Sequence, residues 1–204
     1  MKILAICNQK GGVGKTTTAI NLAASLAHLK KKVLLIDTDP QANATSGVGV
    51  DKATVEQSVY DILVDEVDIN DVITKTAYEN LDIVPSSIVL AGAEVELVSA
   101  ISREQRLKNA ISEVSGKYDY VIIDTPPVGQ VIDAAIVAPK ADGVVMVVEA
   151  NRVKKKVLEK AKEQLEKGGA EFLGVILNKV NSNELGYGGY YGHYGGYGIK
   201  GDKK

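Results

Sequence analysis

Short apolar runs alternate with amphipathic segments along most of the chain. Six runs have the length and the Val, Ile and Leu content of buried strands: residues 3–7, 33–36, 81–84, 121–123, 143–148 and 172–177. Continuous apolar runs of this kind bury both faces of a strand. They therefore predict a mostly parallel central sheet with helices on both faces.

The segments between these runs have apolar residues at helical spacing. We expect helices at residues 16–29, 55–64, 129–138 and 152–167, and one or two helices within 88–115. The regular alternation of strand and helix predicts a single α/β domain over residues 1–180. The fold class predicted from this alternation is α/β.

From residue 181 the pattern changes to a Gly- and Tyr-rich segment without an apolar face. Five of the nine tyrosines fall here: Tyr187, Tyr190, Tyr191, Tyr194 and Tyr197. Because so many glycines are costly to order, residues 181–204 are expected to be a flexible tail.

Composition narrows the class of protein. The 204 residues are 45% hydrophobic and 25% charged, as in ordinary globular domains. The net charge of −2 argues against a globally basic nucleic-acid-binding protein, although a local basic patch remains open. Cys7 lies in an apolar run and is expected in the core. No apolar run is long enough for a signal segment or a membrane span, so a cytoplasmic protein is predicted.

A glycine-rich segment follows the first predicted strand and opens the first predicted helix. It reads Lys10-Gly11-Gly12-Val13-Gly14-Lys15-Thr16-Thr17. Glycines let backbone N–H groups face an anion, and the helix N-terminus adds its dipole. In an α/β domain such a segment predicts the fold class of a P-loop NTPase domain. We expect the segment to bind ATP, with Lys15 at the β- and γ-phosphates, Thr16 on Mg²⁺ and Thr17 supporting the α-phosphate.

Aspartates end two of the predicted strands. Asp37 and Asp39 follow the second strand, and Asp124 follows the apolar run 121–123. A buried strand that ends in aspartate is the Walker-B arrangement, which predicts Asp124 near the metal. Asp37 is expected either to hold Mg²⁺ through water or to brace the loop. For one of the two residues Asp37 and Asp39, the alternative is a structural capping role.

The glycine-rich segment departs from the general P-loop pattern, because Gln9 replaces its first glycine and Lys10 adds a second lysine. This form resembles the ParA/MinD group of ATPases. In that family the early lysine crosses a dimer interface to ATP phosphates of the partner subunit. The resemblance gives this role to Lys10, water positioning to Asp39 and adenine contact to Asn178, whose alternative is a turn-forming role.

Two family resemblances divide the chain. Residues 1–125 resemble ParA/Soj chromosome-partitioning ATPases, through the P-loop, residues 37–41, 90–97 and 101–104. Residues from about 125 to 204 resemble bacterial tyrosine kinases of capsule synthesis, through 125–131, 141–145, 173–180 and the tyrosine tail. The five tail tyrosines are then candidate phosphoacceptors. A natural mosaic, a divergent relative of both families and an engineered chimera all fit.

Three functions follow from these resemblances. The first is an ATP-dependent homodimer that hydrolyses ATP and answers to an activator protein. The second is a tyrosine autokinase with Asp37 or Asp39 as base, which would answer to a membrane adaptor. The third is a nucleotide-binding scaffold with little turnover. DNA binding has weak support, because the nearest basic segment, residues 152–156, is typical of a solvated helix face.

Overall fold

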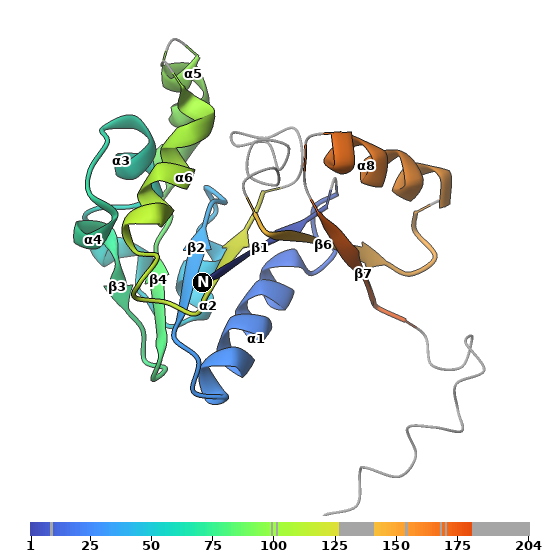
Figure 1. The fold of residues 1–204 in the computed structure, drawn as a ribbon, viewed down its shortest axis with the longest axis horizontal. Helices are drawn as coiled ribbons and strands as arrows, with labels where there is room; N and C mark the ends of the chain where they lie inside the picture. Colours follow the sequence, from blue (N-terminus) through green and yellow to red (C-terminus); the bar gives the residue numbers. More distant parts are fainter. Residues whose placement is uncertain are drawn as a thin grey trace, which may run out of the picture.

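The computed structural model describes residues 1–8, 10–98, 100, 102–126, 141–153, 155–167, 169 and 171–180. In these ranges, strands form one sheet in the order β3-β4-β2-β5-β1-β6-β7 (Figure 1). The strands are β1 Lys2–Cys7, β2 Val33–Asp37, β3 Thr74–Lys75, β4 Leu81–Val84, β5 Tyr120–Asp124, β6 Gly143–Glu149 and β7 Phe172–Asn178. Only β3 pairs antiparallel among them. The predicted mostly parallel sheet of a P-loop NTPase fold is confirmed.

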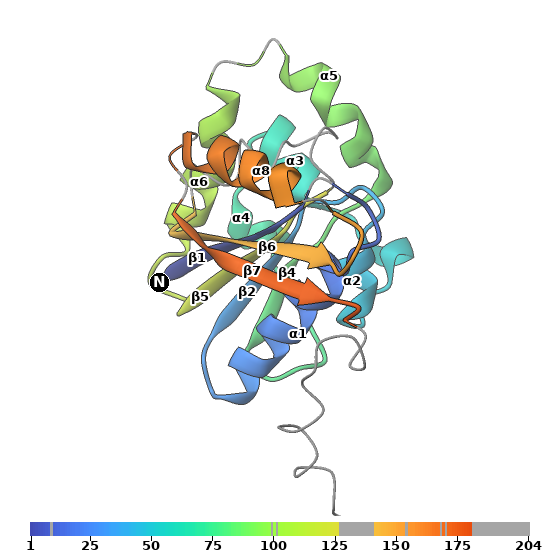
Figure 2. The same cartoon turned by 90° about the vertical axis from the view of Figure 1, so that its right-hand side faces the viewer.

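Helices cover both faces of this sheet (Figure 2). One face carries α1 and α2, and the other carries α3 to α6 and α8. Their bounds are α1 Lys15–His28, α2 Asn43–Gly47, α3 Val59–Val64, α4 Ile69–Val72, α5 Ala93–Leu97, α6 Arg103–Glu113 and α8 Lys155–Lys167, with 3₁₀ turns at Lys52–Thr54 and Ile88–Gly92. The helix predicted at 129–138 and the tail at 181–204 lie outside the described residues.

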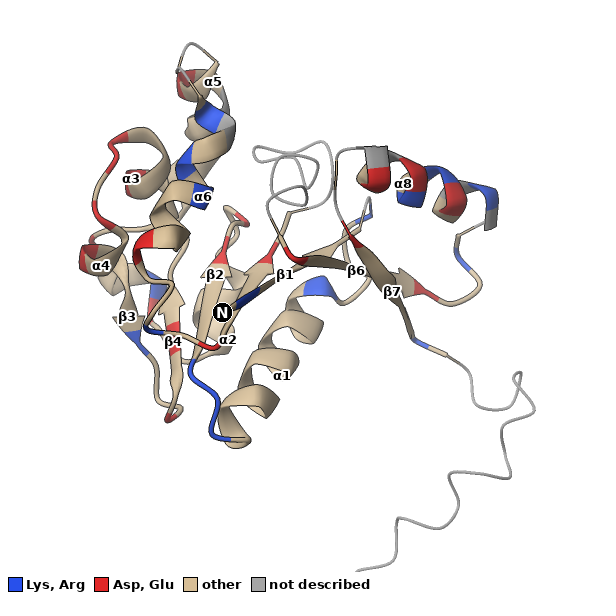
Figure 3. Ribbon diagram, in the orientation of Figure 1, with Lys and Arg blue, Asp and Glu red and all other residues tan. Residues whose placement is uncertain are grey.

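The packing of α1 places the glycine-rich loop against the sheet. Ala19, Ala23 and Ala27 recur every four residues and are buried against strand residues of the same core cluster. Because alanine is small, this stripe lets the helix backbone approach the sheet closely. The helix is almost free of charged residues along its length (Figure 3). Cys7 is buried in the opposite core cluster, as predicted.

Several helix boundaries differ from the prediction. The helix expected from residue 55 begins at Val59, because Ser58 and Asp61 form a capping box that fixes its start. Within 88–115, α5 and α6 are separate helices, which agrees with the prediction of one or two helices there, and Ser102 precedes α6 with a φ of 54°. The last helix begins at Lys155 and not at 152.

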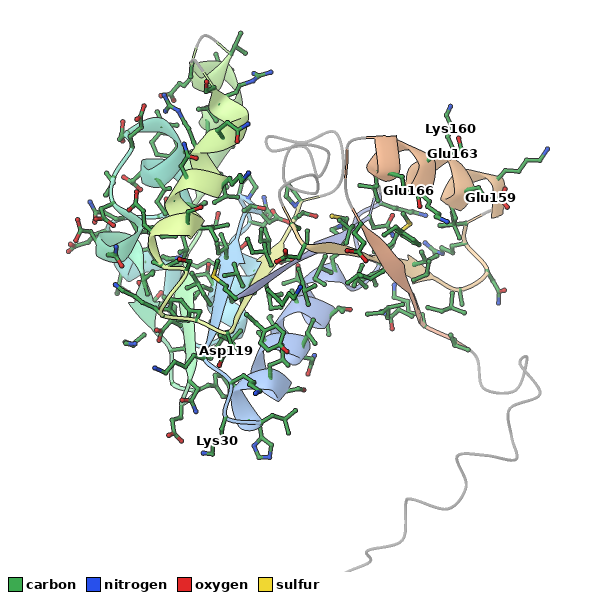
Figure 4. The ribbon with its side chains drawn as sticks, viewed as in Figure 1. Lys30, Asp119, Glu159, Lys160, Glu163 and Glu166 are labelled. Atoms are coloured by element: carbon green, nitrogen blue, oxygen red, sulfur yellow. The ribbon has the colours of Figure 1, made fainter. Side chains whose placement is uncertain are left out.

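Strand β7 is less buried than its apolar sequence predicts. It lies at the edge of the described sheet, and Leu173, Val175, Ile176 and Leu177 are 40–52% exposed. The neighbouring helix α8 carries charges of both signs (Figure 3), including the labelled Glu159, Lys160, Glu163 and Glu166 in Figure 4. None of the helices in the described ranges combines the length and the apolar character needed to cross a bilayer.

Candidate nucleotide-binding site

The predicted site residues meet at the carboxyl edge of the sheet. The glycine-rich loop leaves β1, while Asp37, Asp124 and Asn178 are the last residues of β2, β5 and β7. In the parallel register Asp124 pairs with Ile6 of β1 and with Asp37 of β2. Ligands of open α/β sheets bind at this edge, so the fold brings the sequence motifs together where a ligand site is expected.

The glycine-rich loop leads directly into α1. Gly12 and Gly14 have φ values of 73° and 100°, a conformation that favours glycine. Gly14 precedes the helix without a side-chain cap, and the first turn holds no acidic residue. The free N–H groups of this turn and the helix dipole therefore favour an anion at the start of α1.

Lys15 points back over this loop. Its side chain belongs to a residue only 6% exposed, and Nζ donates a hydrogen bond of 3.3 Å to the carbonyl of Lys10. Burial lowers the pKa of Lys15, against the opposing effect of Asp124 and Asp39. A buried amine that shares one site with two carboxylates is well placed to neutralise a bound phosphate.

Lys10 and Asn8 show how the loop is held at its start. The backbone N–H of Lys10 donates to Asn8 Oδ1 at 3.1 Å, and the Asn8 amide donates to the carbonyl of Val147 on β6. Lys10 is exposed, in keeping with a side chain that reaches outward. Asn8 was not predicted as a site residue, because its local signal is only that of a polar residue directly after a buried strand.

Asp124 is a buried carboxylate whose two oxygens accept no hydrogen bond of regular geometry from the described residues. The Thr16 hydroxyl nevertheless lies close enough to act on this carboxylate. Burial and the charge of Asp37 raise its pKa to about 7, although the Thr16 hydroxyl and Lys15 act in the opposite direction. An unpartnered buried carboxylate is costly. Its oxygens and the Thr16 hydroxyl are the hard donors that Mg²⁺ prefers, so these residues fit the predicted metal.

Asp37 is committed to the loop that follows β2. Its Oδ1 accepts from the N–H of Asp39 at 3.1 Å, and its Oδ2 accepts from the N–H and the hydroxyl of Thr45, both at 2.8 Å. Burial raises the pKa of Asp37 while these hydrogen bonds lower it. This geometry favours the bracing role over metal binding, and a water-mediated contact with Mg²⁺ stays a prediction.

Asp39 lies on the braced loop and is half-buried. Its Oδ1 accepts from the N–H of Gln41 at 2.9 Å, so it caps a turn. Thr38, which sequence analysis did not single out, donates through its N–H and its hydroxyl to the carbonyl of Asp124, at 3.0 and 2.7 Å. The loop that carries Asp39 is therefore tied to the strand that carries Asp124. Water positioning by Asp39 stays a prediction.

Asn178 contacts the glycine-rich loop from β7. Its Nδ2 donates to the carbonyl of Val13 at 2.9 Å, and its Oδ1 accepts from the N–H of Lys179 at 2.8 Å. Lys179 Nζ donates to the carbonyl of Gly12 at 3.0 Å. Sequence analysis proposed Asn178 for adenine, which stays a prediction, and it assigned no role to Lys179.

Two glycine substitutions should separate backbone strain from crowding in the loop. A Cβ on Gly14 would lie 2.3 Å from Asn178 Nδ2, whereas a Cβ on Gly12 would meet nothing within 4 Å. Both substitutions carry the strain of a positive φ, about 1 kcal/mol. We expect Gly14→Ala to lower both the free energy of unfolding and ATP affinity clearly more than Gly12→Ala, measured by denaturant unfolding and calorimetry. Equal losses would contradict the Asn178 contact.

Comparison with known proteins places this site in a family. A model of the AAA domain family matches residues 1–167. The sporulation initiation inhibitor protein Soj of Bacillus subtilis is 64% identical over 126 residues, which cover 62% of this chain and 50% of Soj. The tyrosine-protein kinase CpsD of Streptococcus agalactiae is 41% identical over 187 residues, 92% of this chain and 79% of CpsD. The chain thus spans about half the length of Soj.

A solved structure extends the likeness to three dimensions. Cobyrinic acid a,c-diamide synthase from Mycobacterium smegmatis, with bound ADP and magnesium, superposes with a TM-score of 0.81 at 30% identity, over 90% of this chain and 76% of the synthase. The relatives include both protein groups suggested by the sequence motifs. The chain belongs to the AAA domain family, as a ParA-type P-loop protein that is also similar to the CpsD tyrosine kinases.

Proposed function

We propose that the chain binds ATP with Mg²⁺ and hydrolyses it. The observation that carries this proposal is the buried Asp124 carboxylate, which accepts no regular hydrogen bond from the described residues and lies beside Thr16 and Lys15 at the start of α1. A cation and a polyphosphate would together satisfy these groups and the free N–H groups of the helix. The bound ADP and magnesium of the similar synthase support the same ligands here.

The residues divide the work of hydrolysis among them. Gly11, Gly12, Val13 and Gly14 supply backbone N–H groups to the phosphates, and Thr17 supports the α-phosphate. Thr16 and Asp124 hold Mg²⁺, which neutralises negative charge on the phosphates when bound. Lys15 stabilises charge that develops as the γ-phosphoryl group moves to water. Asp39 orients that water, ADP leaves, and inorganic phosphate is released.

On the basis of Lys10, we propose that the active form is a homodimer. Its side chain is exposed, and its backbone is fixed by Asn8 and Lys15. In a face-to-face dimer each Lys10 would contact the phosphates held by the other subunit. Lys10→Ala should then spare ATP binding and impair turnover, and the turnover of the wild-type chain should rise more than linearly with protein concentration. An activator or adaptor protein would act on this dimer.

Tyrosine autokinase activity is the second candidate function. It is favoured by the 41% identity with CpsD across 92% of the chain and by the five tail tyrosines. The same phosphate-binding residues would serve, with a tyrosine hydroxyl in place of water and Asp37 or Asp39 as the base. In this second function residues 1–180 form the catalytic domain, and residues 181–204 carry the tyrosines that it phosphorylates.

Labelled ATP distinguishes these functions. We expect [γ-³²P]ATP to yield free labelled phosphate, and Lys15→Ala to remove that release. A chain that retains label, and loses it when the five tail tyrosines are replaced by phenylalanine, would be a kinase. Binding without either product would support a scaffold of mosaic or chimeric origin. Gel-shift assays would test DNA binding through residues 152–156, and cell fractionation would test the cytoplasmic location.

A further inference from the structure

We infer that Asn178 and Lys179 are positioning residues that shape the phosphate cradle from the end of β7. We call this pair the β7 latch. The inference rests on the proposed nucleotide binding and deepens it, because it assigns the pair an action on phosphate recognition. A residue that reads the adenine base would act on a different part of the ligand.

The latch holds two consecutive carbonyls of the glycine-rich loop. Lys179 Nζ donates to the Gly12 carbonyl at 3.0 Å, and Asn178 Nδ2 donates to the Val13 carbonyl at 2.9 Å. The two partners are separated from the loop by 165 and 167 positions along the chain. Only the fold brings them together, through the shared carboxyl edge of β1, β6 and β7.

Because the peptide bond is planar, these two contacts also fix the direction of the N–H groups in the glycine-rich loop. In a trans peptide the C=O of one residue and the N–H of the next point in opposite directions. A Gly12 carbonyl held toward β7 therefore directs the Val13 N–H away from β7. The Val13 carbonyl directs the Gly14 N–H in the same way. N–H groups of this kind line an anion site, so the latch fixes donors that would otherwise be free to rotate.

Glu149 holds the cationic half of the latch in place. Its Oε1 lies 3.5 Å from Lys179 Nζ and 3.2 Å from Arg152 Nε. Glu149 is only 9% exposed and pairs in register with Asn178 across β6 and β7. The carboxylate anchors the Lys179 ammonium beside the loop, and this attraction offsets the side-chain entropy that a lysine loses when it is held in one place.

The pair also accounts for the need for glycine at position 14. A Cβ there would lie 2.3 Å from Asn178 Nδ2. With one N–H on Val13 and its oxygen on Lys179, the Asn178 amide fills the space beside the loop. The latch and the loop are therefore complementary in shape as well as in hydrogen bonding.

A comparison of ligands with and without a base tests the inference. The full chain, Lys179→Met and Asn178→Ala would be titrated calorimetrically with ATP, GTP and inorganic tripolyphosphate in the presence of Mg²⁺. We expect both variants to lose about tenfold in affinity for all three ligands, the usual effect of losing one such hydrogen bond. Glu149→Gln should cause a smaller loss that is not additive with Lys179→Met.

Lys30→Met is the matched control. Lys30 also has a positive φ, 61° against 54° for Lys179, and also pairs with one glutamate, Glu79. It should leave all three affinities unchanged. Melting without ligand would confirm that each variant folds, and the exposed Lys179 carries the test if Asn178→Ala does not fold.

The outcomes separate the two proposals. A loss confined to ATP, with tripolyphosphate unaffected, would show base reading and overturn the latch. Unchanged binding of all three ligands would also overturn it. A wild-type chain that binds none of them would overturn the proposed function itself, and the latch with it.

Discussion

Lys15→Ala is expected to weaken ATP binding by about a hundredfold or more, because it removes the one buried amine that faces the phosphates from within the subunit. Lys15 is 6% exposed, and its amine lies over the loop backbone at the start of α1. Lys179, another described lysine at this loop, is held by the Gly12 carbonyl and Glu149 and therefore does not replace Lys15. Calorimetric titration with ATP and Mg²⁺ would measure the loss.

The stability of the ligand-free protein provides the internal check on this experiment. Burial lowers the pKa of Lys15, so the folded state holds the ammonium at a cost. The alanine variant also loses the attraction between Lys15 and the buried Asp124, which opposes this gain, so it should melt close to the wild-type chain. Lys30→Ala serves as the control, because Lys30 lies just beyond the opposite end of α1 (Figure 4), and it should preserve ATP binding. Equal ATP affinity in Lys15→Ala and the wild type would show that the site has been misplaced.

Local patterns made the core of this site predictable. The glycine spacing, the lysine and the start of the helix lie within eight consecutive residues, and each strand-terminal aspartate directly follows its apolar run. Once the strands are parallel, their carboxyl ends share one edge. The sequence could therefore predict that Lys15, Thr16 and Asp124 converge, as the structure shows.

What the sequence could not predict depends on contacts between distant segments. The bond of Lys179 to Gly12 spans 167 positions, and no local pattern marks such a lysine. The hydrogen bonds from Thr45 to Asp37 were likewise not predictable, because an aspartate at the end of a strand can bind either a metal or backbone N–H groups. The exposure of β7 was missed for another reason. An apolar run indicates a strand, but only the order of strands shows which one lies at the edge.

Asp124→Asn should raise the stability of the ligand-free protein at neutral and alkaline pH. Burial and Asp37 raise the pKa of Asp124 from its ordinary 3.8 to about 7. Between these values the folded state binds a proton that the unfolded chain has lost, so the free energy of unfolding falls as the pH rises through this window. Above pH 7 the penalty is complete and amounts to at most about 4 kcal/mol. The neutral asparagine avoids it.

The stability advantage of the variant should therefore vanish near pH 4 and be largest above pH 7. Denaturant unfolding at several pH values would measure it, with Asp119→Asn as control, since the exposed Asp119 precedes the same strand β5 (Figure 4). A variant less stable than the wild type at pH 8 would show that the carboxylate is satisfied by partners of its own.

Ligand should reverse this order of stability. In the wild type Mg²⁺ and ATP would satisfy the Asp124 oxygens, which accept no hydrogen bond of regular geometry from the described residues. Binding to the folded state alone raises the free energy of unfolding in proportion to the logarithm of ligand excess. Asp124→Asn should gain little from Mg²⁺ and ATP and should not hydrolyse ATP. An asparagine variant with normal Mg²⁺-dependent turnover would mean that the buried charge serves another purpose. If Asp124→Asn is more stable than the wild type without ligand but is not stabilised by Mg²⁺ and ATP, the buried charge of Asp124 serves metal binding.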